Sequence, residues 1–545
     1  MRAFLETGLG FDGWDDPRHR TTMRWAFLFA GIAIGVRFFF WAYTGRVWED
    51  ALITVQHSEN CALGLGLTHH PSEPRVHGFT SPLSVLVPLI GDLIHVGFGI
   101  SFIRIVSAFC GALTVFCVAT IAVHPRVQFS TPIAVLAMGY VALEHHQIFF
   151  GMSGMETQMA VLLLLMSMYY LIANRPTHLG ISLGLCMLAR PDFGFWAAIV
   201  GLYLLGANRR HLPRVVGVAF LVYGPWLVFA TIYYGSPIPN TLIAKSLGYP
   251  QWWRNPDLTY SEFKRTFIDN LVYDVFAQLG PTHLGHALRR GTWFWDKRVI
   301  SNGVVLLAIL GSLAAVMKKE WRLLPVVGFV LVYAVYYAVF VPNLFPWYFA
   351  PVTAATVLLS VYGLQALTAR IEWARIRVAI LSAITIVYLG FLVAILPTTF
   401  RAEKQIQEVV ENGVRKQIGL YLAQVMAPNE TVGLEPLGYV GYYARRTTYD
   451  YPGMGSRIVT DFLRTHPDQR SMNGVFNALR PDYLLLRPYE YDAIRNAPDG
   501  RWINEAYHLE RAFAVASDEP LWLQEDYAAH FLLFRKNAGA AGDAA

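Results

Sequence analysis

The chain has 545 residues, of which 54% are hydrophobic and only 15% are charged, and its mean hydropathy is +0.37. Soluble domains carry about 25% charged residues, so this composition excludes a soluble globular protein and indicates a membrane protein. The formal net charge of +6 does not indicate nucleic acid as a partner. The basic residues form short clusters between apolar runs, which is typical of membrane topology.

The N-terminal segment, residues 1–23, contains acidic as well as basic residues. We therefore expect a cytoplasmic segment without a cleavable signal peptide, and a first apolar run that stays as an anchor. Three of the four cysteines lie inside apolar runs, so the sequence predicts no disulfide framework.

Apolar runs of near-spanning length follow one another along the chain. They cover residues 24–43, 103–123, 130–148, 157–173, 213–234, 299–317, 323–342, 348–368 and 378–397, and two shorter runs, 178–190 and 194–207, flank the sequence ARPDFG. If the run at 81–99 lies along the external interface and the two short runs are tilted helices, every basic cluster is cytoplasmic. This arrangement gives about eleven transmembrane helices within residues 24–397.

The polar stretches between these helices then fall on one side of the membrane, in external loops at 44–102 and 235–298. From residue 398 the composition changes. Helical periodicity at 402–426 precedes strand-like runs at 431–443, 482–488 and 530–536. We therefore predict an external α/β domain at 398–536 and a disordered tail at 537–545.

Two adjacent carboxylates, Glu49 and Asp50, follow the first predicted transmembrane helix directly. A single acidic residue at this place can simply be a solvated side chain that marks the end of the transmembrane helix. Two of them at the mouth of a helix bundle favour a catalytic role, because a desolvated carboxylate near the interface can serve as a general base toward a hydroxyl.

Two further acidic or basic positions on the external side have a structural and a functional interpretation. Ser153 and Glu156 form the pattern of a capping box, which explains Glu156 unless its carboxylate also faces a cavity. Arg190 and Asp192 stand at the break between the two short helices. They are either a buried structural ion pair, or Arg190 grips a phosphate at an interrupted helix that lines a cavity.

Lys245 ends the sequence GSPIPNTLIAK (235–245), where it either neutralises a phosphate or snorkels to lipid headgroups. Histidines are frequent in the external stretches, but none has the spacing of a closed zinc site, so we predict neither a metal nor another cofactor. These histidines are His57, His69, His70, His77, His145 and His146. The aromatic run at 250–255 is interpreted as an interfacial anchor.

Several of these stretches, taken in order, resemble the GT-C membrane glycosyltransferases related to the actinobacterial terminal arabinofuranosyltransferases. The likeness rests on EDALITVQHSENCALGLGLTHHPSEPRVHGFTSPL (49–83), SGMET (153–157), RPD (190–192), YGSPIPNTLIAK (234–245), FPWYFAP (345–351) and GYVGYYARRTTYDYPGM (438–454). It covers most of the chain, and the series is more specific than any single piece.

The resemblance implies a GT-C type polytopic helical protein of the bacterial plasma membrane, with its C-terminal domain outside. It implies transfer of a sugar, such as arabinose, from a polyprenyl-phosphate donor to a hydroxyl of an envelope glycan, lipid or protein, with inversion. The paired carboxylates supply the base, and we favour Asp50 because it directly precedes ALI. Glu49 replaces the first aspartate of the family pattern.

The same resemblance implies a donor-phosphate and substrate site on the external side. Its residues are Arg190, Lys245, Glu156, Asp192, His77, Asn240, Trp347 and Tyr348. His77 stands where the family has a glutamate, whose role is then lost or moved to Glu73. A transporter or flippase of lipid-linked glycans, or a scaffold for envelope assembly, remains the alternative. A transporter would favour internal repeats and ionisable residues at the bilayer midplane, and the sequence shows neither.

Overall fold

The computed structural model describes residues 6, 8–9, 16, 19–249, 252–255, 257–279, 297–341 and 344–538. Most of the predicted N-terminal segment, part of the second external loop, the pair Pro342–Asn343 and most of the predicted disordered tail therefore lie outside the described residues. The chain forms two compact units. The first unit comprises Met1–Tyr43, Arg104–Pro225 and Gln251–Ala402, and the second comprises Thr44–Ile103, Trp226–Pro250 and Glu403–Ala545.

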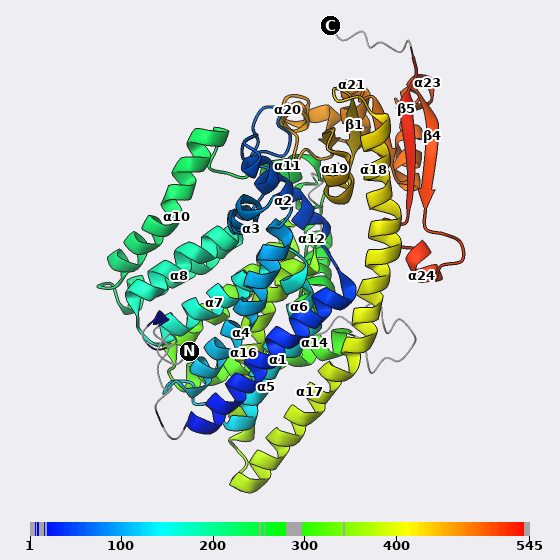
Figure 1. Cartoon of the computed structure of the whole chain (residues 1–545). Helices are drawn as coiled ribbons and strands as arrows, with labels where there is room; N and C mark the ends of the chain where they lie inside the picture. The colour runs from blue at the N-terminus through cyan, green and yellow to red at the C-terminus, as the bar shows by residue number, and fades with distance from the viewer. Residues whose placement is uncertain are drawn as a thin grey trace. The chain divides into compact units, whose positions relative to one another are not determined.

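The first unit is built from helices (Figure 1). The helices that lie wholly or mostly in it are α1 (Arg20–Thr44), α4 (Gly99–Val123), α5 (Thr131–Leu143), α6 (His145–Met152), α7 (Thr157–Ile172), α8 (Pro176–Ala189), η3 (Pro191–Phe193), α9 (Gly194–Ala207), α10 (Leu212–Tyr234), η4 (Trp252–Arg254), α12 (Tyr260–Asp269), η5 (Asn270–Val275), α13 (Phe276–Leu279), α14 (Lys297–Met317), η7 (Trp321–Leu323), α15 (Leu324–Phe340), α16 (Pro346–Thr368) and α17 (Ala374–Gln405).

The predicted apolar runs of this unit are all helical. Within the described residues, seven helices are long and apolar enough to cross a membrane, by length and composition. The runs that became α7, α8, α9 and α14 gave shorter apolar helices. A perpendicular crossing needs about 20 residues, so these four are the least regular part of the predicted topology.

One predicted transmembrane helix is interrupted. The run at 130–148 forms α5 and α6, separated by Glu144 in an extended conformation (φ −66°, ψ 134°). The guanidinium of Arg37 on α1 donates hydrogen bonds to the carbonyl oxygens of Ala142 (3.2 Å) and Val141 (3.1 Å) at the end of α5. These carbonyls have lost their helical partners at the break, and a buried donor satisfies them.

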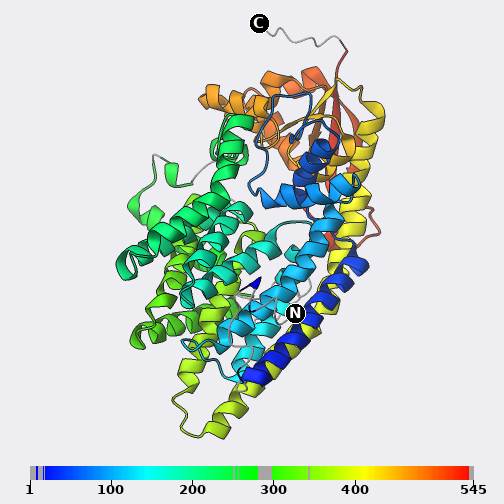
Figure 2. The same ribbon diagram turned by 60° about the vertical axis from the view of Figure 1, so that its left-hand side comes forward.

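Two helices of the first unit, α1 and α17, lie side by side in both views (Figure 2), with the Phe40 and Phe400 rings 4.8 Å apart. The sequence places the predicted border between membrane and external domain at 397/398. No break occurs there, because α17 continues into the π-helical η8 (Ile406–Arg415) and then into α18 (Lys416–Val425).

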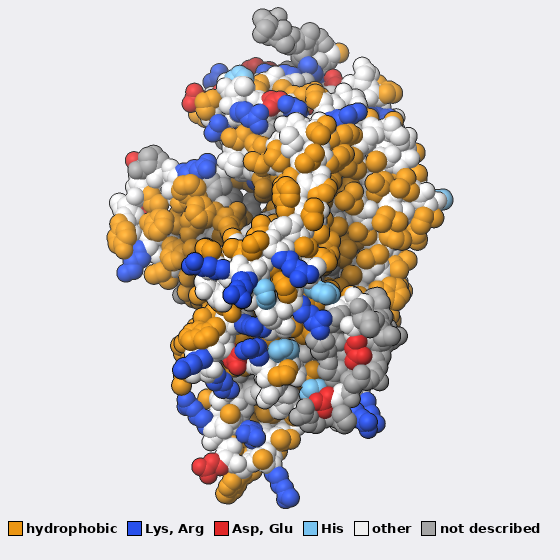
Figure 3. Space-filling model, turned by 90° about the vertical axis from the view of Figure 1, so that its left-hand side faces the viewer, with side chains coloured by type: hydrophobic (Ala, Val, Ile, Leu, Met, Phe, Trp, Pro, Cys, Tyr) orange, Lys and Arg blue, Asp and Glu red, His pale blue; other side chains and the backbone are white. Residues whose placement is uncertain are grey.

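Hydrophobic side chains cover wide areas of the face in Figure 3, and Lys and Arg side chains gather in its lower half. In the sequence, basic residues of the first unit follow the ends of successive helices, as Arg126 follows α4, Arg175 follows α7 and Lys318 follows α14. This segregation is the pattern of a membrane-embedded bundle with one basic end.

The second unit combines helices with one mixed sheet (Figure 1). Its elements are α2 (Glu49–Ala62), α3 (Leu83–Ile94), α11 (Asn240–Gly248), η8, α18, β1 (Thr431–Leu434), α19 (Leu437–Ala444), β2 (Thr447–Asp450), α20 (Arg457–Thr465), η9 (Pro467–Gln469), α21 (Met472–Leu479), β3 (Tyr483–Leu486), α22 (Pro488–Arg495), α23 (Trp502–Ala506), β4 (Tyr507–Ala514), α24 (Leu521–Gln524) and β5 (His530–Lys536).

The strand order is β2-β1-β3-β5-β4. Strands β1, β2 and β3 are parallel, and β5 pairs antiparallel with both β3 and β4. The central strand β3 is buried on both faces. Tyr483 and Leu485 pack into one hydrophobic cluster, and Leu484 and Leu486 pack into the other. This alternation places a core on each side of the sheet.

The sequence-based strand predictions were partly right. β3 and β5 fall inside the predicted runs, whereas the run at 431–443 contains only the short β1 and then turns into α19. Strands β2 and β4 were missed. β4 is exposed at most of its positions, so it lacks the apolar alternation that identifies a half-buried strand.

Candidate functional site

The carboxylate doublet opens helix α2, where acidic side chains interact favourably with the helix dipole. Glu49 is held by two partners. Nη1 of Arg415 lies 2.8 Å from its Oε2, and the backbone N–H of Gly438 donates to its Oε1 (3.2 Å). Burial raises the pKa of Glu49 to about 7, while Arg415 opposes that rise.

Glu49 thereby belongs to a buried network of charges. Arg415 also pairs with Glu411 (3.1 Å). Arg46, just before α2, pairs with Glu403 (3.1 Å) and with Glu411 (2.9 Å). Removal of one partner from a buried network leaves an uncompensated charge, which costs about 3–5 kcal/mol. Glu49 therefore contributes to the attachment of α2 to η8.

Asp50 differs from its neighbour. Among the residues that the structure describes, none donates a hydrogen bond to its partly buried carboxylate. Burial raises its pKa, and the charge of Lys245 is the largest effect that opposes this rise, with Glu435 and Arg415 as further charged neighbours. A desolvated carboxylate that is not engaged by a partner has the properties of a general base.

Lys245 and Asn240 both lie on α11. The backbone N–H of Asn240 donates to the carbonyl of His77 (2.9 Å). Its Nδ2 donates to the carbonyl of Gly453 (2.7 Å) and to Oγ1 of Thr460 (3.0 Å). Asn240 thus fixes the start of α11. This helix carries Lys245, whose charge lowers the pKa of Asp50 more than that of any other cation.

His77 is buried and stacks on Tyr234, with the ring centroids 4.9 Å apart at an angle of 6°. Neither ring nitrogen has a hydrogen-bond partner within the described residues. Burial, and then the charge of His57, lower the pKa of His77 to about 3. The imidazole is therefore neutral near pH 7 and supplies no positive charge to a phosphate.

The other histidines of this loop, His57, His69 and His70, are buried too. The pKa of His57 is lowered to about 4 by burial, and its Nδ1 lies 2.9 Å from the carbonyl of Ile53. His69 and His70 contact each other (2.9 Å), and His70 contacts Oγ1 of Thr448 (2.6 Å). Within the described part of the chain, no group of three His, Cys, Asp or Glu side chains could hold a metal ion.

The first unit contains the second set of predicted residues, centred on Arg190 and Asp192. Arg190 binds Asp192 with two hydrogen bonds, from Nε (3.1 Å) and from Nη2 (2.7 Å). Its Nη1 donates to the carbonyl of Trp347 (3.2 Å). A guanidinium has five N–H donors. The second N–H of Nη2 is shared by two weaker bonds to the hydroxyls of Tyr333 and Tyr337, both at 3.4 Å. One N–H of Nη1 therefore has no partner among the described residues.

The two tyrosines, Tyr333 and Tyr337, were missed by the sequence analysis. Both hydroxyls donate to Oδ2 of Asp192, at 2.9 and 2.8 Å. Tyr333 also lies 2.7 Å from the carbonyl of Tyr348, whose ring lies under the Arg190 guanidinium at 5.5 Å. Their spacing of four residues on one helix face was the signal that could have found them.

Glu156 is buried, but it does not belong to the predicted capping box. Ser153 ends α6, and its hydroxyl donates to the carbonyl of Phe150 (3.1 Å). Helix α7 begins only at Thr157, with Glu156 itself at the N-cap position. The capping-box prediction was wrong because the SGMET turn belongs to the connection between α6 and α7.

The candidate residues thus form two groups, one in each unit. Glu49, Asp50, His77, Asn240 and Lys245 lie in the second unit, and the remaining ones lie in the first. That remainder consists of Glu156, Arg190, Asp192, Trp347 and Tyr348. The sequence also missed the partners of the doublet, above all Arg415, because no local pattern links them to α2.

Further charged side chains of the second unit are linked to the charged neighbours of Asp50. Arg487 pairs with Glu435 (2.8 Å), one of the charged neighbours of Asp50. Tyr527 accepts a hydrogen bond from Nη2 of Arg415 (2.9 Å). The side chains of Tyr489 and Tyr527 are 62% and 57% exposed, so aromatic surface lies next to the charged network.

Comparison with known proteins gives a family for part of the chain and a fold for the whole. Residues 399–533 match the family described as "Domain of unknown function (DUF8728)". No curated protein matches the chain.

Among solved structures, the chain is similar to the oligosaccharyltransferase AglB of Archaeoglobus fulgidus, in complex with an inhibitory peptide and a dolichol-phosphate. The TM-score is 0.52 at 14% identity, over 92% of this chain and 75% of that chain. It is also similar to ArnT of Cupriavidus metallidurans in the apo state, with a TM-score of 0.53 at 13% identity, over 94% and 98% of the two chains. The chain therefore has the GT-C fold, a multi-pass helical membrane architecture followed by a C-terminal domain with a small sheet.

Proposed function

We propose that the chain is a membrane glycosyltransferase that transfers a sugar from a polyprenyl-phosphate donor to a hydroxyl of a cell-envelope acceptor. The GT-C fold supports the class of reaction. The dolichol-phosphate in the complex of Archaeoglobus AglB supports a lipid-linked donor. The motif likeness at 49–83 favours a pentofuranose such as arabinose as the sugar.

The observation that carries this proposal is that one of the two adjacent carboxylates is engaged by protein partners and the other is not. Glu49 is engaged by Arg415 and by the Gly438 amide, while no described residue donates a hydrogen bond to Asp50. A structural pair would fix both carboxylates. An acid that stays partly buried and uncommitted costs stability, and such arrangements are frequent where the group acts on a substrate.

In this proposal Asp50 removes the proton from the acceptor hydroxyl as its oxygen attacks the anomeric carbon. The bond between that carbon and the phosphate oxygen breaks, and the electron pair leaves with the polyprenyl phosphate. Direct displacement inverts the anomeric carbon. Lys245, the cation with the largest effect on Asp50, offsets the negative charge that develops on the leaving phosphate.

Arg190 has a smaller part here than the sequence suggested. Most of its donors are satisfied by Asp192 and by the carbonyl of Trp347, which positions the start of α16. A role of Trp347 and Tyr348, at that helix start, in substrate binding stays a prediction of the sequence resemblance. No step requires a metal or another cofactor in this scheme.

We also propose that the protein lies in the bacterial plasma membrane, with its basic helix ends in the cytoplasm and its C-terminal domain outside. The clustering of basic residues supports this orientation. The acceptor is an envelope glycan, lipid or protein.

The test is complementation of a strain that lacks the gene, with wild-type protein, Asp50→Asn or Glu49→Gln, followed by mass spectrometry of polyprenyl-linked sugars and envelope glycans. We expect D50N to accumulate one polyprenyl phosphosugar and to lose one terminal sugar, at wild-type protein levels. Full glycan transfer by D50N would exclude Asp50 as the base. Accumulation of the donor on the cytoplasmic side alone would favour a flippase.

A further inference from the structure

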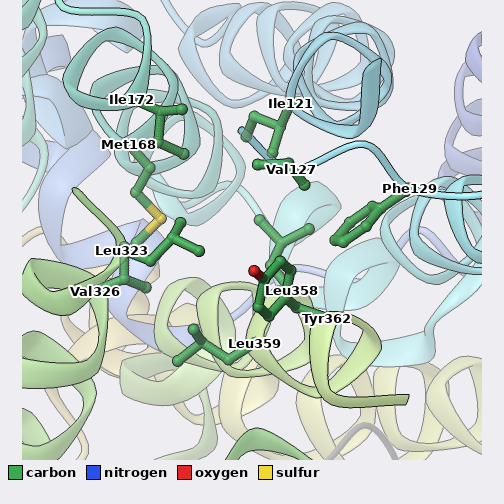
Figure 4. A pocket seen from close by; sticks show the side chains of 10 residues that line it. All are labelled: Ile121, Val127, Phe129, Met168, Ile172, Leu323, Val326, Leu358, Leu359 and Tyr362. Atoms are coloured by element: carbon green, nitrogen blue, oxygen red, sulfur yellow. The ribbon is translucent and has the colours of Figure 1, made fainter. Parts of the chain in front are cut away.

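The proposed transfer needs a binding place for the acceptor, and the hollow of the first unit shown in Figure 4 does not provide one. It lies between α4, α7, α15 and α16 and is lined by apolar side chains such as Ile121, Met168 and Leu358. Its volume is about 30 Å³, which suffices for about two water molecules. The hollow is therefore part of the packed core, and an acceptor has to bind elsewhere.

The sheet of the second unit reverses its winding between β1 and β3. Helix α19, which connects β1 to β2, packs on one face of the sheet through Leu437 and Val440. Helices α20 and α21, which connect β2 to β3, pack on the other face through Val459 and Phe476. In open α/β sheets, ligands bind outside the carboxyl ends of the strands at such a switch point. The carboxyl ends of β1 and β3 are therefore a candidate binding region.

A charged pair stands at these two strand ends. Glu435 directly follows β1 and Arg487 directly follows β3, and Nη2 of Arg487 donates to Oε2 of Glu435 (2.8 Å). Arg487 also donates to Glu490 (2.5 Å) and to the carbonyl of Tyr527 (3.0 Å), so the fold holds it in place. Oε1 of Glu435 accepts no hydrogen bond from any described residue. The Glu435 side chain is 28% exposed, so this oxygen is available to a ligand.

Helix α2 brings the proposed base to the same strand ends. Helix α19 begins two residues after Glu435, and the backbone N–H of Gly438 donates to Oε1 of Glu49 (3.2 Å). The two helix starts are so close that a Cβ at Gly438 would collide with the side chain of Glu49. Asp50 is the next residue of α2, and the charge of Glu435 contributes to its raised pKa. Asp50 and Glu435 are thus neighbouring carboxylates, each with an oxygen that no described residue engages.

Two exposed tyrosines lie beside this pair. The guanidinium of Arg487 lies 6.0 Å from the ring centroid of Tyr489 and 5.4 Å from that of Tyr527. Nη2 of Arg415 donates to the hydroxyl of Tyr527 (2.9 Å), which fixes that ring. The C–H groups of a sugar ring carry a small positive charge and therefore suit the negative face of an aromatic ring. Tyr489 offers such a face close to Glu435.

The charges around these rings favour a neutral ligand. Arg415 and Arg487 are each paired with two carboxylates. Asp50 adds a further carboxylate, and Lys245 is the cation that acts on it most strongly. Ionised carboxylates only accept hydrogen bonds, whereas hydroxyls can donate them. A neutral carbohydrate therefore suits this region better than a second phosphate or an acidic group.

We propose that Tyr489 and Glu435 bind the terminal sugar of a neutral glycan as the acceptor. This inference rests on the proposed glycosyl transfer and narrows its acceptor to a carbohydrate. The sugar ring packs on Tyr489 beside Tyr527, and one hydroxyl donates to Oε1 of Glu435. A neighbouring hydroxyl then donates to Asp50 and attacks the donor. Tyr489 and Glu435 orient the acceptor and exchange no proton with it.

The first test measures binding without the donor. Purified full-length protein in detergent is titrated with α-1,5-linked arabinopentaose or maltopentaose, and saturation-transfer NMR gives the Kd. Tyr489→Ala should weaken the binding of the preferred glycan about fivefold, whereas Tyr489→Phe keeps the ring and should bind as wild type does. Unchanged binding by Y489A, or no binding of either glycan by the wild type, would overturn the proposal.

Leu509→Ala is the matched control for this measurement. Leu509 is a 52% exposed apolar side chain of the same unit. It lies on β4, which is separated from β3 by β5, and L509A should bind as the wild type does. Equal weakening in L509A and Y489A would show that the loss is not specific to the strand ends and would contradict the proposal.

Transfer kinetics separate this inference from the proposed function. Glu435→Gln keeps an oxygen for Arg487 but loses the charge, so it should raise the acceptor KM about tenfold and leave the donor KM unchanged. Thermal unfolding checks that the variant is folded. Glycan binding by a wild type that transfers no sugar would contradict the proposed function alone. A wild-type acceptor KM in both E435Q and Y489A, or transfer to a serine-containing peptide but to neither glycan, would overturn the inference and leave the transfer reaction intact.

Discussion

Glu49 and Asp192 both pair with a buried arginine. The two ion pairs differ in whether the carboxylates around them are all engaged by hydrogen bonds. Asp192 accepts two hydrogen bonds from Arg190 and two from tyrosine hydroxyls, so the charges of that group in the first unit satisfy one another. In the second unit, Arg415 engages Glu49 and Glu411, while the adjacent Asp50 stays without a hydrogen bond from any described residue.

This difference separates residues that hold the fold from residues that are available for chemistry. A saturated pair has little capacity left for a substrate. A network that ends beside an uncommitted carboxylate fixes that carboxylate in place and leaves its oxygens available. Substitutions can test each half of this comparison, beginning with the largest expected effect.

Lys245→Gln should lower the transfer rate about 10²-fold, which is the usual effect of removing one preorganised charge at a developing anion. The rate is measured with protein in vesicles and polyprenyl phosphoarabinose as donor. Arg457→Gln on α20 is the control, because this exposed arginine pairs with Asp461 of its own helix. An unchanged rate for K245Q would remove Lys245 from the mechanism.

Arg415→Met should lower the free energy of unfolding of the second unit by about 3–5 kcal/mol, because it leaves Glu49 and Glu411 without their buried partner. Arg495→Met removes an exposed pair with Asp492 and should cost at most about 1 kcal/mol. Denaturant unfolding followed by hydrogen exchange of α2 and η8 measures both. Equal losses in the two variants would show that the network is not the anchor of α2.

Tyr333→Phe should cost about 1 kcal/mol, the net value of a typical buried hydrogen bond, and should leave the KM for the donor unchanged. Asp192→Asn should cost more, because it strips Arg190 of its charged partner. Thermal unfolding of the full-length protein ranks the two variants. A raised donor KM in Y333F with unchanged stability would instead place the tyrosines in the substrate site.

A pH effect is expected around Glu73 and Asp450 in the second unit. Burial raises the pKa of each carboxyl to about 7, and Ser456 donates to Glu73 (3.0 Å). Raised pKa values mean that the folded state binds more protons, so the stability they contribute is full below about pH 4 and is lost as the pH rises toward 7.

Hydrogen exchange of residues 447–460 should therefore be slower at pH 5 than at pH 8, after correction for the intrinsic exchange rate. Glu73→Gln should reduce this difference, and Asp518→Asn, at an exposed position, should preserve it. Slower corrected exchange at pH 8 would reverse the sign of the effect and contradict the burial of these carboxyls in protonated form.

The sequence predicted those features that depend on local patterns. Apolar runs became helices because length and hydropathy suffice for that inference. The Arg190–Asp192 pair could be anticipated, since two opposite charges that are two residues apart at a helix break lie within reach of each other. The Glu49–Asp50 doublet stood out by its place after α1.

The features that the sequence did not predict depend on contacts between residues far apart in the chain. The break between α5 and α6 at Glu144 is stabilised by Arg37 on α1. The role of Glu49 depends on Arg415, and the burial of His70 depends on contact with Thr448. No local pattern encodes such pairs, so the sequence favoured Asp50 only through its place before ALI and not through the contact of Glu49 with Arg415.

The most direct test compares Asp50→Asn and Glu49→Gln in purified, vesicle-reconstituted protein with polyprenyl phosphoarabinose and an envelope glycan acceptor. Loss of a general base lowers rates about 10²–10⁴-fold, so we predict that loss for D50N at wild-type stability. For E49Q we predict a smaller loss, accompanied by reduced stability. Transfer by D50N at the wild-type rate, or abolished transfer by a fully stable E49Q with D50N active, would contradict the assignment of Asp50 as the base.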